Sequence, residues 1–222
     1  PDWLTISNSN SNSLSFDGAN DYVDCGNNAS LNDLTELSIS AWINFSDTDS
    51  RSIIAEKHSG GNKGWWFARQ ENDGKLIINL GSEGAISYAY SVNEVPVEQW
   101  VHVAASYDGT NIKLYINGEE EDVVQDFDGD GQIVNTSIPL RFGDGNWGDD
   151  MNLRGFMDNI SLWNNLKWLI LYLASIQTQG NTRTSGSEYL DAVAISAQPG
   201  LPLTLLSVHA TGTDIRQHGL LN

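Results

Sequence analysis

The stretch from Gln99 to Gly118, QWVHVAASYDGTNIKLYING, constrains the fold more than any other part of the chain. Residues 100–107 are apolar on both faces of an extended chain, and such a strand usually lies between two covering layers. The pairs Asp108-Gly109 and Asn117-Gly118 supply the positive φ angles of tight hairpin turns. The pattern therefore predicts an antiparallel meander of three strands, with the first near the middle of a sheet and the third over residues 119–125.

Short stretches with strand patterning recur throughout residues 13–165, separated by turn residues roughly every eight to twelve positions. The clearest is residues 37–45, where apolar and polar side chains alternate. No long amphipathic helix is predicted in this span. The sequence therefore predicts an all-β fold, in which two antiparallel sheets form a jelly-roll sandwich.

Three motifs, in this order, resemble the laminin-G-like, concanavalin A-like jelly-roll family. They are LSFDGANDYVDCG at residues 14–26, W-x-H-V-A with Y-D-G and L-Y-I-N-G within residues 100–118, and RGFMDNISLWN at residues 154–164. The resemblance covers about residues 13–165. It implies the same jelly roll, and also one domain of a larger extracellular or cell-surface protein. Because this fold hosts lectins, adhesion modules, hydrolases and spacers, function has to be argued from the site.

The net charge of −18 excludes several classes of partner. A surface this acidic repels nucleic-acid phosphates and anionic membranes, whereas it suits the capture of divalent cations. Cys25 is the single cysteine, so there is no internal disulfide framework, and we interpret it as a small buried hydrophobe. The opening residues PDWLTISNSN show no signal-peptide pattern.

The charge is distributed unevenly, which predicts the domain organisation. Residues 166–222 carry three acidic and three basic side chains, so the whole net charge lies in residues 1–165. Residues 1–12 are interpreted as a linker and residues 13–165 as the jelly-roll domain. The apolar run Leu166–Ile176 is shorter than the roughly 20 residues that a membrane-spanning helix needs. We interpret residues 166–222 as an atypical tail, non-native or poorly ordered; the alternative is a short element docked on the sandwich.

The segment DFDGDG is the sharpest candidate for a metal site. It places Asp126, Asp128 and Asp130 at alternate positions, so that a tight loop can present several oxygens to one Ca²⁺ ion. The pattern matches the first half of an EF-hand loop, but Ser137 stands where that loop has a bidentate Glu, and no flanking helices are predicted. Any further ligand must come from elsewhere, such as Asn135. The alternative is an acidic loop in solvent.

Asp158 is a second candidate metal ligand. It is expected in the last strand, on the same face as apolar side chains, where a carboxylate needs a partner. In the jelly rolls that this chain resembles, the matching Asp often helps to hold a structural cation against the first strands, where Asp17 and Asp21 stand here. Hydrogen bonds to turn amides are the open alternative.

Two regions could contact a sugar. In FGDGNWGDD, Asp144 and Asp149 flank Trp147, and a projecting Trp can stack on the apolar face of a sugar ring. The alternative is a Trp that folds back onto the core. Trp65 and Trp66 are adjacent and must point to opposite faces, so one is expected in the core and the other at the surface; we take Trp65 as the surface candidate.

The sequence argues against catalysis. Jelly-roll glucanases place two carboxylates on one strand face as E-x-D-x-E, whereas the nearest run here, EEED at residues 119–122, is contiguous. His102 is interpreted as a core histidine, and no Ser-His-Asp arrangement can be assembled. The interpretation that these patterns favour is a non-catalytic, calcium-dependent module that binds a glycan or another surface ligand. The alternative is a structural or protein-binding spacer of an adhesion protein, with a hydrolase or lyase less favoured.

Overall fold

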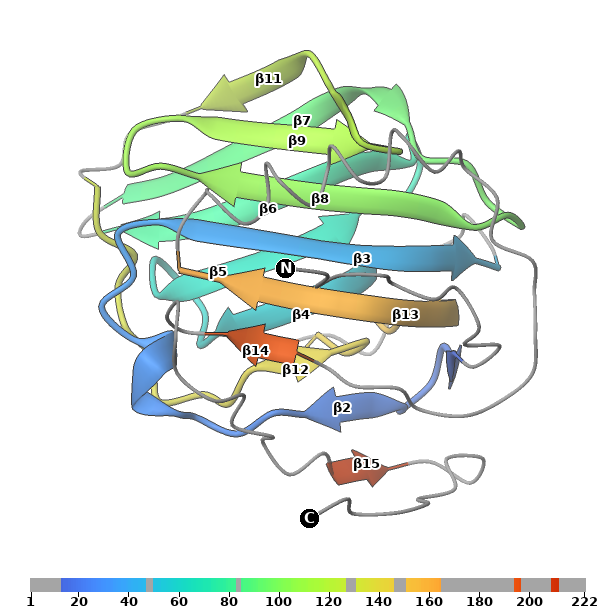
Figure 1. The fold of residues 1–222 in the computed structure, drawn as a ribbon, viewed down its shortest axis with the longest axis horizontal. Helices are drawn as coiled ribbons and strands as arrows, with labels where there is room; N and C mark the ends of the chain where they lie inside the picture. The colour runs from blue at the N-terminus through green and yellow to red at the C-terminus, as the bar shows by residue number, and fades with distance from the viewer. Residues whose placement is uncertain are drawn as a thin grey trace, which may run out of the picture.

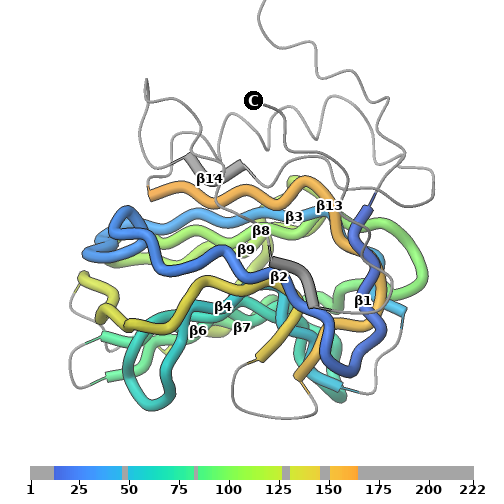
Figure 2. The backbone as a smooth tube through the Cα atoms, turned by 90° about the horizontal axis from the view of Figure 1, so that it is seen from below, coloured from blue at the N-terminus to red at the C-terminus, as the bar shows by residue number. Residues whose placement is uncertain are grey.

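The computed structural model describes residues 13–46, 50–82, 85–126, 131–145 and 151–164, together with two short strands at 194–196 and 209–211. These residues form two sheets that lie face to face (Figures 1 and 2). The all-β, two-sheet sandwich that the sequence predicts is therefore confirmed. The described helical structure is a single 3-10 turn, Ala29–Leu31, and no described helix is long and apolar enough to cross a membrane.

The seven-stranded sheet has the order β1 (Leu14–Asp17), β13 (Arg154–Trp163), β3 (Leu37–Phe45), β8 (Val101–Tyr107), β9 (Ile112–Ile116) and β10 (Glu119–Glu120), with β14 (Ala194–Ser196) also paired to β13. The eight-stranded sheet has the order β11 (Val123–Asp126), β7 (Ala85–Glu94), β6 (Lys75–Ser82), β5 (Gly64–Arg69), β4 (Ser52–His58), β12 (Arg141–Phe142), β2 (Tyr22–Asp24) and β15 (His209–Thr211). All pairings are antiparallel except that of β14 with β13.

The central strand predicted from the sequence is confirmed. β8 lies between β3 and β9, and all seven of its residues are buried. In the turn that follows, the Asp108 carboxylate accepts hydrogen bonds from the backbone N–H groups of Thr110 and Asn111, at 2.8 and 2.6 Å. Burial raises the pKa of Asp108, but these hydrogen bonds outweigh it and hold the pKa at about 2.

The third strand of the predicted meander is divided between the two sheets. Glu119 and Glu120 pair with β9, whereas Val123–Asp126 pair with β7 of the opposite sheet. The acidic run at residues 119–122 has no apolar side chain that could pack in the core. Val123 is the first residue after this run that packs against the core. The chain therefore crosses from one sheet to the other at residues 121–122.

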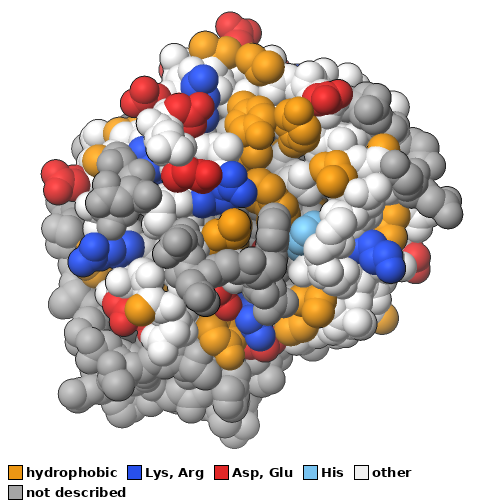
Figure 3. All heavy atoms as spheres, turned by 180° about the vertical axis from the view of Figure 1, so that it is seen from behind, with side chains coloured by type: hydrophobic (Ala, Val, Ile, Leu, Met, Phe, Trp, Pro, Cys, Tyr) orange, Lys and Arg blue, Asp and Glu red, His pale blue; other side chains and the backbone are white. Residues whose placement is uncertain are grey.

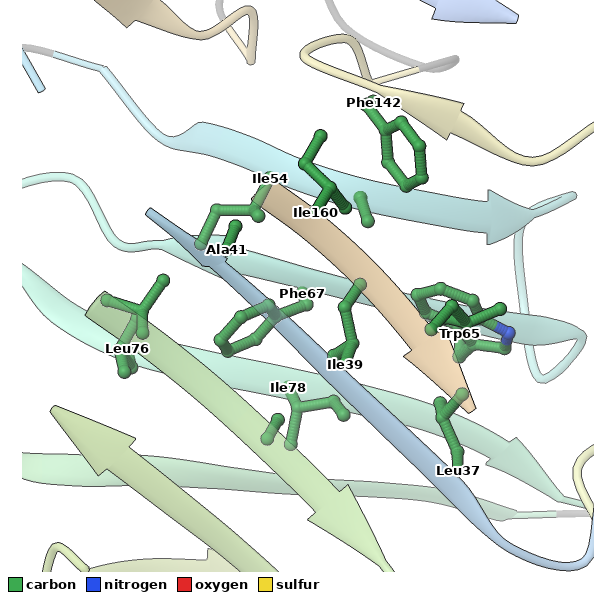
Figure 4. Close-up of a cluster of buried hydrophobic side chains, with 14 of the residues drawn as sticks. Leu37, Ile39, Ala41, Ile54, Trp65, Phe67, Leu76, Ile78, Phe142 and Ile160 are labelled. Carbon is green, nitrogen blue, oxygen red and sulfur yellow. The ribbon is translucent and has the colours of Figure 1, made fainter. Parts of the chain in front are cut away.

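The core fills the space between the inner faces of the two sheets (Figure 4). Leu37, Ile39 and Ala41 of β3 face the other sheet, from which Trp65 and Phe67 of β5 point back. Cys25 is also buried, as the sequence predicts, and its pKa is raised to about 12 by burial and by the nearby charge of Asp24. The thiol is therefore protonated at neutral pH.

Within residues 166–222 the structure describes only β14 and β15, which pair with β13 and with β2. The rest of this segment and residues 1–12 lie outside the described residues. The predicted domain boundary after residue 165 stays a prediction.

His102 generates a prediction about acid stability. Its side chain is fully buried on the outer face of the seven-stranded sheet, with its ring 5.5 Å from that of Trp42. Burial lowers the pKa of His102 to about 3, whereas a histidine in the unfolded chain has a pKa of about 6.5. As the pH falls below about 6.5, the unfolded state therefore binds a proton that the folded state does not bind.

We expect this difference to remove about 2 kcal/mol of stability between pH 7.5 and pH 5. A His102→Gln variant should not lose these ~2 kcal/mol of stability between pH 7.5 and pH 5, because glutamine does not titrate. Its stability at pH 7.5 should be lower than that of the parent. The measurement is urea unfolding of both proteins at the two pH values. An equal decrease in the two proteins would show that His102 is not the titrating group.

Candidate functional site

The outer face of the eight-stranded sheet carries a continuous row of polar and aromatic side chains, one from each of seven neighbouring strands. From β2 to β11, the strand register aligns Asp24, Arg141, Glu56, Trp66, Asn79, Tyr88 and Asp126. We call this set the cross-strand row. Figure 3 shows the side of the molecule on which it lies, where hydrophobic, acidic and basic side chains gather together.

The alternation of β7 explains how the sequence builds this face. Ala89 is fully buried in the core, while Ile86, three positions earlier, is 38% exposed. Tyr88 and Tyr90 share the outward direction of Ile86, because side chains two residues apart lie on one face of a strand. Strand β7 therefore buries small residues and presents aromatic ones.

Tyr88 and Tyr90 form the accessible aromatic part of the face. Their rings meet edge to face, with centroids 5.3 Å apart, and both side chains are half-buried. The Tyr88 hydroxyl donates to Asp126 Oδ2 at 3.3 Å, and Val124, opposite Tyr90, is 64% exposed. Aromatic and polar groups thus lie next to each other in a position that solvent reaches.

Trp66 lies in the same row but is only 5% exposed. The guanidinium of Arg51 lies 5.2 Å from the centre of its ring, and Arg51 is held there by Glu71, with Nε 2.9 Å from Oε2. Trp66 and Ile77 belong to one small hydrophobic cluster, and Met151 packs against that cluster. Arg51 therefore covers the ring of Trp66, which is not open for stacking with a ligand.

Asn79 is the chemically unusual member of the row. It lies between Trp66 and Tyr88, is 8% exposed, and its buried Oδ1 has no hydrogen-bond partner among the described residues. Leaving a buried acceptor unsatisfied costs about 1–3 kcal/mol.

The loop after β4 bounds the row on one side. Gly81, two residues after Asn79, has no Cβ, and a Cβ there would collide with the backbone of Asn62 and Lys63. The loop also bonds to His58, whose Nε2 is 3.2 Å from the Gly61 carbonyl oxygen. The glycine therefore lets the loop lie directly against β6, next to Asn79.

Asp144, predicted as a ligand-binding residue, pairs with Arg141 of the row. Its Oδ2 accepts from Arg141 at 3.0 Å, while Asp24 Oδ2 lies 4.0 Å from Arg141 Nε, and the guanidinium stacks 4.4 Å above the ring of Tyr22. The sequence did not point to Arg141. Trp147 and Asp149, the other candidates from this loop, lie outside the described residues.

Trp65 is not a surface residue, so its prediction as a sugar platform is wrong. It is 1% exposed and packs in the core beside Phe67, on the inner side of β5 (Figure 4). The expectation that the adjacent tryptophans point to opposite faces holds, since Trp66 belongs to the outer cluster. The assignment fails because alternation does not say which of the two faces is the inner one.

The candidate calcium ligands are described only in part. Asp128 and Asp130 lie outside the described residues, and Asp126 accepts the hydroxyl of Tyr88. Asn135 forms a reciprocal pair with Asp33, in which each bond is 2.7 Å long. Within the described ranges, no three acidic, histidine or cysteine side chains come together as a metal-binding group.

Asp17 and Asp158 do not share a site. The register places Asp17 opposite Arg154, so Asp158 lies four residues farther along β13, about 13 Å away. The Asp17 carboxylate accepts the Ala19 N–H at 2.8 Å, and that of Asp158 accepts the Asn159 N–H at 2.6 Å. Ala19 follows β1 in a turn, whereas Asn159 lies inside β13, where the register with β3 shifts, so the role predicted for Asp158 stays a prediction.

Lys57 holds the segment that carries Asn135. Lys57 is 2% exposed, and its ammonium donates to Asn27 Oδ1 and to the carbonyl oxygens of Thr136 and Ile138, at 2.7, 2.8 and 3.0 Å. Burial lowers the pKa of Lys57, and the three acceptors surround the charge. Sequence reasoning missed this role, because the acceptors lie far from Lys57 in the sequence.

A Lys57→Met substitution should lower the free energy of unfolding by about 3 kcal/mol, because it leaves buried acceptors without a donor. The melting temperature should then fall by roughly 6–12 °C. The exposed Lys63→Met is the matched control and should change stability by less than about 0.5 kcal/mol. Equal melting temperatures of the two variants would show that Lys57 does not hold this segment in place.

Comparisons with known proteins agree with this architecture. The family profile of the concanavalin A-like lectin/glucanases superfamily matches residues 17–167, while no curated protein matches the chain. The native heptameric SAP-like pentraxin of Limulus polyphemus superposes with a TM-score of 0.60 and 14% identity, covering 90% of this chain and 91% of the pentraxin chain.

CBM40 of the Ruminococcus gnavus IT-sialidase gives a TM-score of 0.61 at 13% identity, covering 74% of this chain and 96% of that one. The same CBM40 bound to α2,3-sialyllactose gives 0.59, again at 13% identity and with 74% and 96% coverage. Identities this low establish a shared fold and no more.

Proposed function

Because this chain belongs to the concanavalin A-like lectin/glucanases superfamily, we propose that it is a glycan-binding module whose binding surface is the outer face of the eight-stranded sheet. One observation carries the proposal. The unsatisfied Oδ1 of Asn79 lies beside the accessible rings of Tyr88 and Tyr90.

The two kinds of group match the two kinds of surface on a sugar. A pyranose ring has an apolar face, which packs on an aromatic ring, and a rim of hydroxyls, which need hydrogen-bond partners. Tyr90 and Tyr88 offer the aromatic faces, and Asn79 Oδ1 and the Asp126 carboxylate offer acceptors. The CBM40 bound to sialyllactose supports this class of ligand, although not this position on the sheet.

We propose that the module is not catalytic. Glycoside hydrolysis needs two carboxylates that flank the bond to be cleaved. In the cross-strand row, Glu56 is fully buried, and Arg141 separates it from Asp24. These acids support the structure of the sheet instead of facing a common space.

We propose further that the module acts outside the cell or at its surface, as one domain of a larger protein. The resemblance to laminin-G-like modules supports this location. The bound partner is then a glycan of a surface or of the extracellular matrix, or a protein that carries one.

The binding surface predicts how three variants behave. Asn79→Ala and Tyr90→Ala should each weaken glycan binding by about tenfold, or roughly 1.4 kcal/mol. The matched control is Phe156→Ala, which removes an exposed aromatic side chain from the seven-stranded sheet. It should leave affinity unchanged.

The measurement is a glycan array followed by calorimetry on the sugars that bind. Melting temperatures separate binding from folding, because Asn79→Ala removes an unsatisfied group and should keep the melting temperature within about 3 °C of the parent. Unchanged affinity in Asn79→Ala and Tyr90→Ala, with reduced affinity in Phe156→Ala, would move the site to the other sheet.

We also propose that Ca²⁺ stabilises the loop from Asp126 to Asp130, since three carboxylates within five residues repel one another without a cation. Ca²⁺ at a hundred times its Kd should add about 2.7 kcal/mol, a rise in melting temperature of roughly 5–10 °C. Asp128→Ala should abolish the rise, whereas Asp149→Ala should keep it. Thermal melting in EDTA, Ca²⁺ and Mg²⁺ tests this, and identical curves in EDTA and Ca²⁺ would refute it.

A further inference from the structure

We infer that the outer face of the eight-stranded sheet selects neutral glycans and discriminates against acidic ones; this inference rests on the proposed function. A site for sialic acid, uronic acid or sulfate needs a cation that is free to pair with the anion. The charges on the outer face of the eight-stranded sheet are the opposite of what such a site needs.

Among the described residues, four basic side chains lie on the outer face of this sheet and its adjoining turns, and three of them have a carboxylate partner; the fourth is the exposed Lys63. Arg51 is 2.9 Å from Glu71, Arg141 is 3.0 Å from Asp144, and Lys75 is 3.5 Å from Asp73. Two of these pairs are hydrogen-bonded as well, so an anionic ligand would have to displace a protein carboxylate.

Among the described residues, acidic side chains outnumber the basic ones on the same face. Besides the three carboxylates just named, Asp24, Glu56 and Asp126 belong to the cross-strand row, where Asp24 is a second partner of Arg141 at 4.0 Å. Glu94 lies opposite Lys75. Asp126 reaches Tyr88, so its charge stands beside the aromatic part of the surface. A second anion brought there would meet repulsion that its sugar contacts must overcome.

Two further groups at the edge of the face do not reverse this balance. Lys63, on the loop beside Gly81, is exposed, and one exposed cation in water contributes little to binding. His58 is 3% exposed, and burial lowers its pKa, so that it is neutral at physiological pH. The described side chains therefore give this face a negative charge, in line with the chain's charge of −18.

The test uses the full chain and pairs of oligosaccharides that differ only in charge. Lactose is compared with α2,3-sialyllactose, and neutral oligosaccharides are compared with uronic-acid or sulfated forms of the same backbone. Whichever neutral sugar binds should bind at least about tenfold more tightly than its acidic counterpart at low ionic strength, and salt should narrow the difference.

A pair of matched variants locates the effect. Glu71→Gln frees Arg51 on this face, and Glu120→Gln frees Lys113, which pairs with Glu120 at 2.9 Å on the seven-stranded sheet. The ratio of neutral to acidic affinity should fall at least about threefold in Glu71→Gln and stay unchanged in Glu120→Gln. The ratio is the readout, because freeing Arg51 also uncovers Trp66 and alters neutral binding.

The outcomes separate this inference from the proposed function. If acidic glycans bind the parent protein as tightly as neutral ones, or more tightly, the selectivity is wrong while glycan binding stands. If a glycan binds and Glu120→Gln changes the ratio as much as Glu71→Gln does, the effect does not come from this face. If no glycan of either kind binds, the proposed function fails and the inference fails with it.

Discussion

The contact between the inner faces of the two sheets is the interaction on which the rest of the structure depends. Side chains such as Ile39 and Phe67 are fully buried there, and burial of apolar surface is the dominant favourable term in folding. Because successive side chains in a strand alternate, each residue committed to this core sends its neighbours outward. Phe67 thus places Trp66 on the outer face, and Ala89 does the same for Tyr88.

The outer face of the eight-stranded sheet is organised differently from the core, although the same strands build it. Ion pairs such as Arg51–Glu71 and Arg141–Asp144 fix the positions of its charged side chains. Asn79 keeps a buried oxygen without a partner, which costs stability and suits a surface that completes its hydrogen bonds with a ligand. The sandwich therefore supplies rigidity, and the outer face holds the polar and aromatic groups on which the proposed function depends.

Asp126 connects the two proposed sites. It ends β11 and closes the cross-strand row at Tyr88, and it is also the first carboxylate of the DFDGDG segment. A cation bound by that segment would change the charge at the edge of the proposed glycan-binding face. The proposed calcium binding and glycan binding would then be coupled through one side chain.

The sequence by itself determined the sandwich, the buried strand β8, its Asp108-Gly109 turn and the buried state of Cys25 and His102, because these depend on local patterns of polarity and turn chemistry. Only the tertiary structure decided that Trp65 faces the core, that residues 119–126 divide between two sheets, and that Asp17 and Asp158 lie far apart. Alternation gives two faces without saying which is the inner one, and strand register depends on partners distant in the sequence. The cross-strand row consists of residues from seven strands, so only the assembled sheet could bring it together.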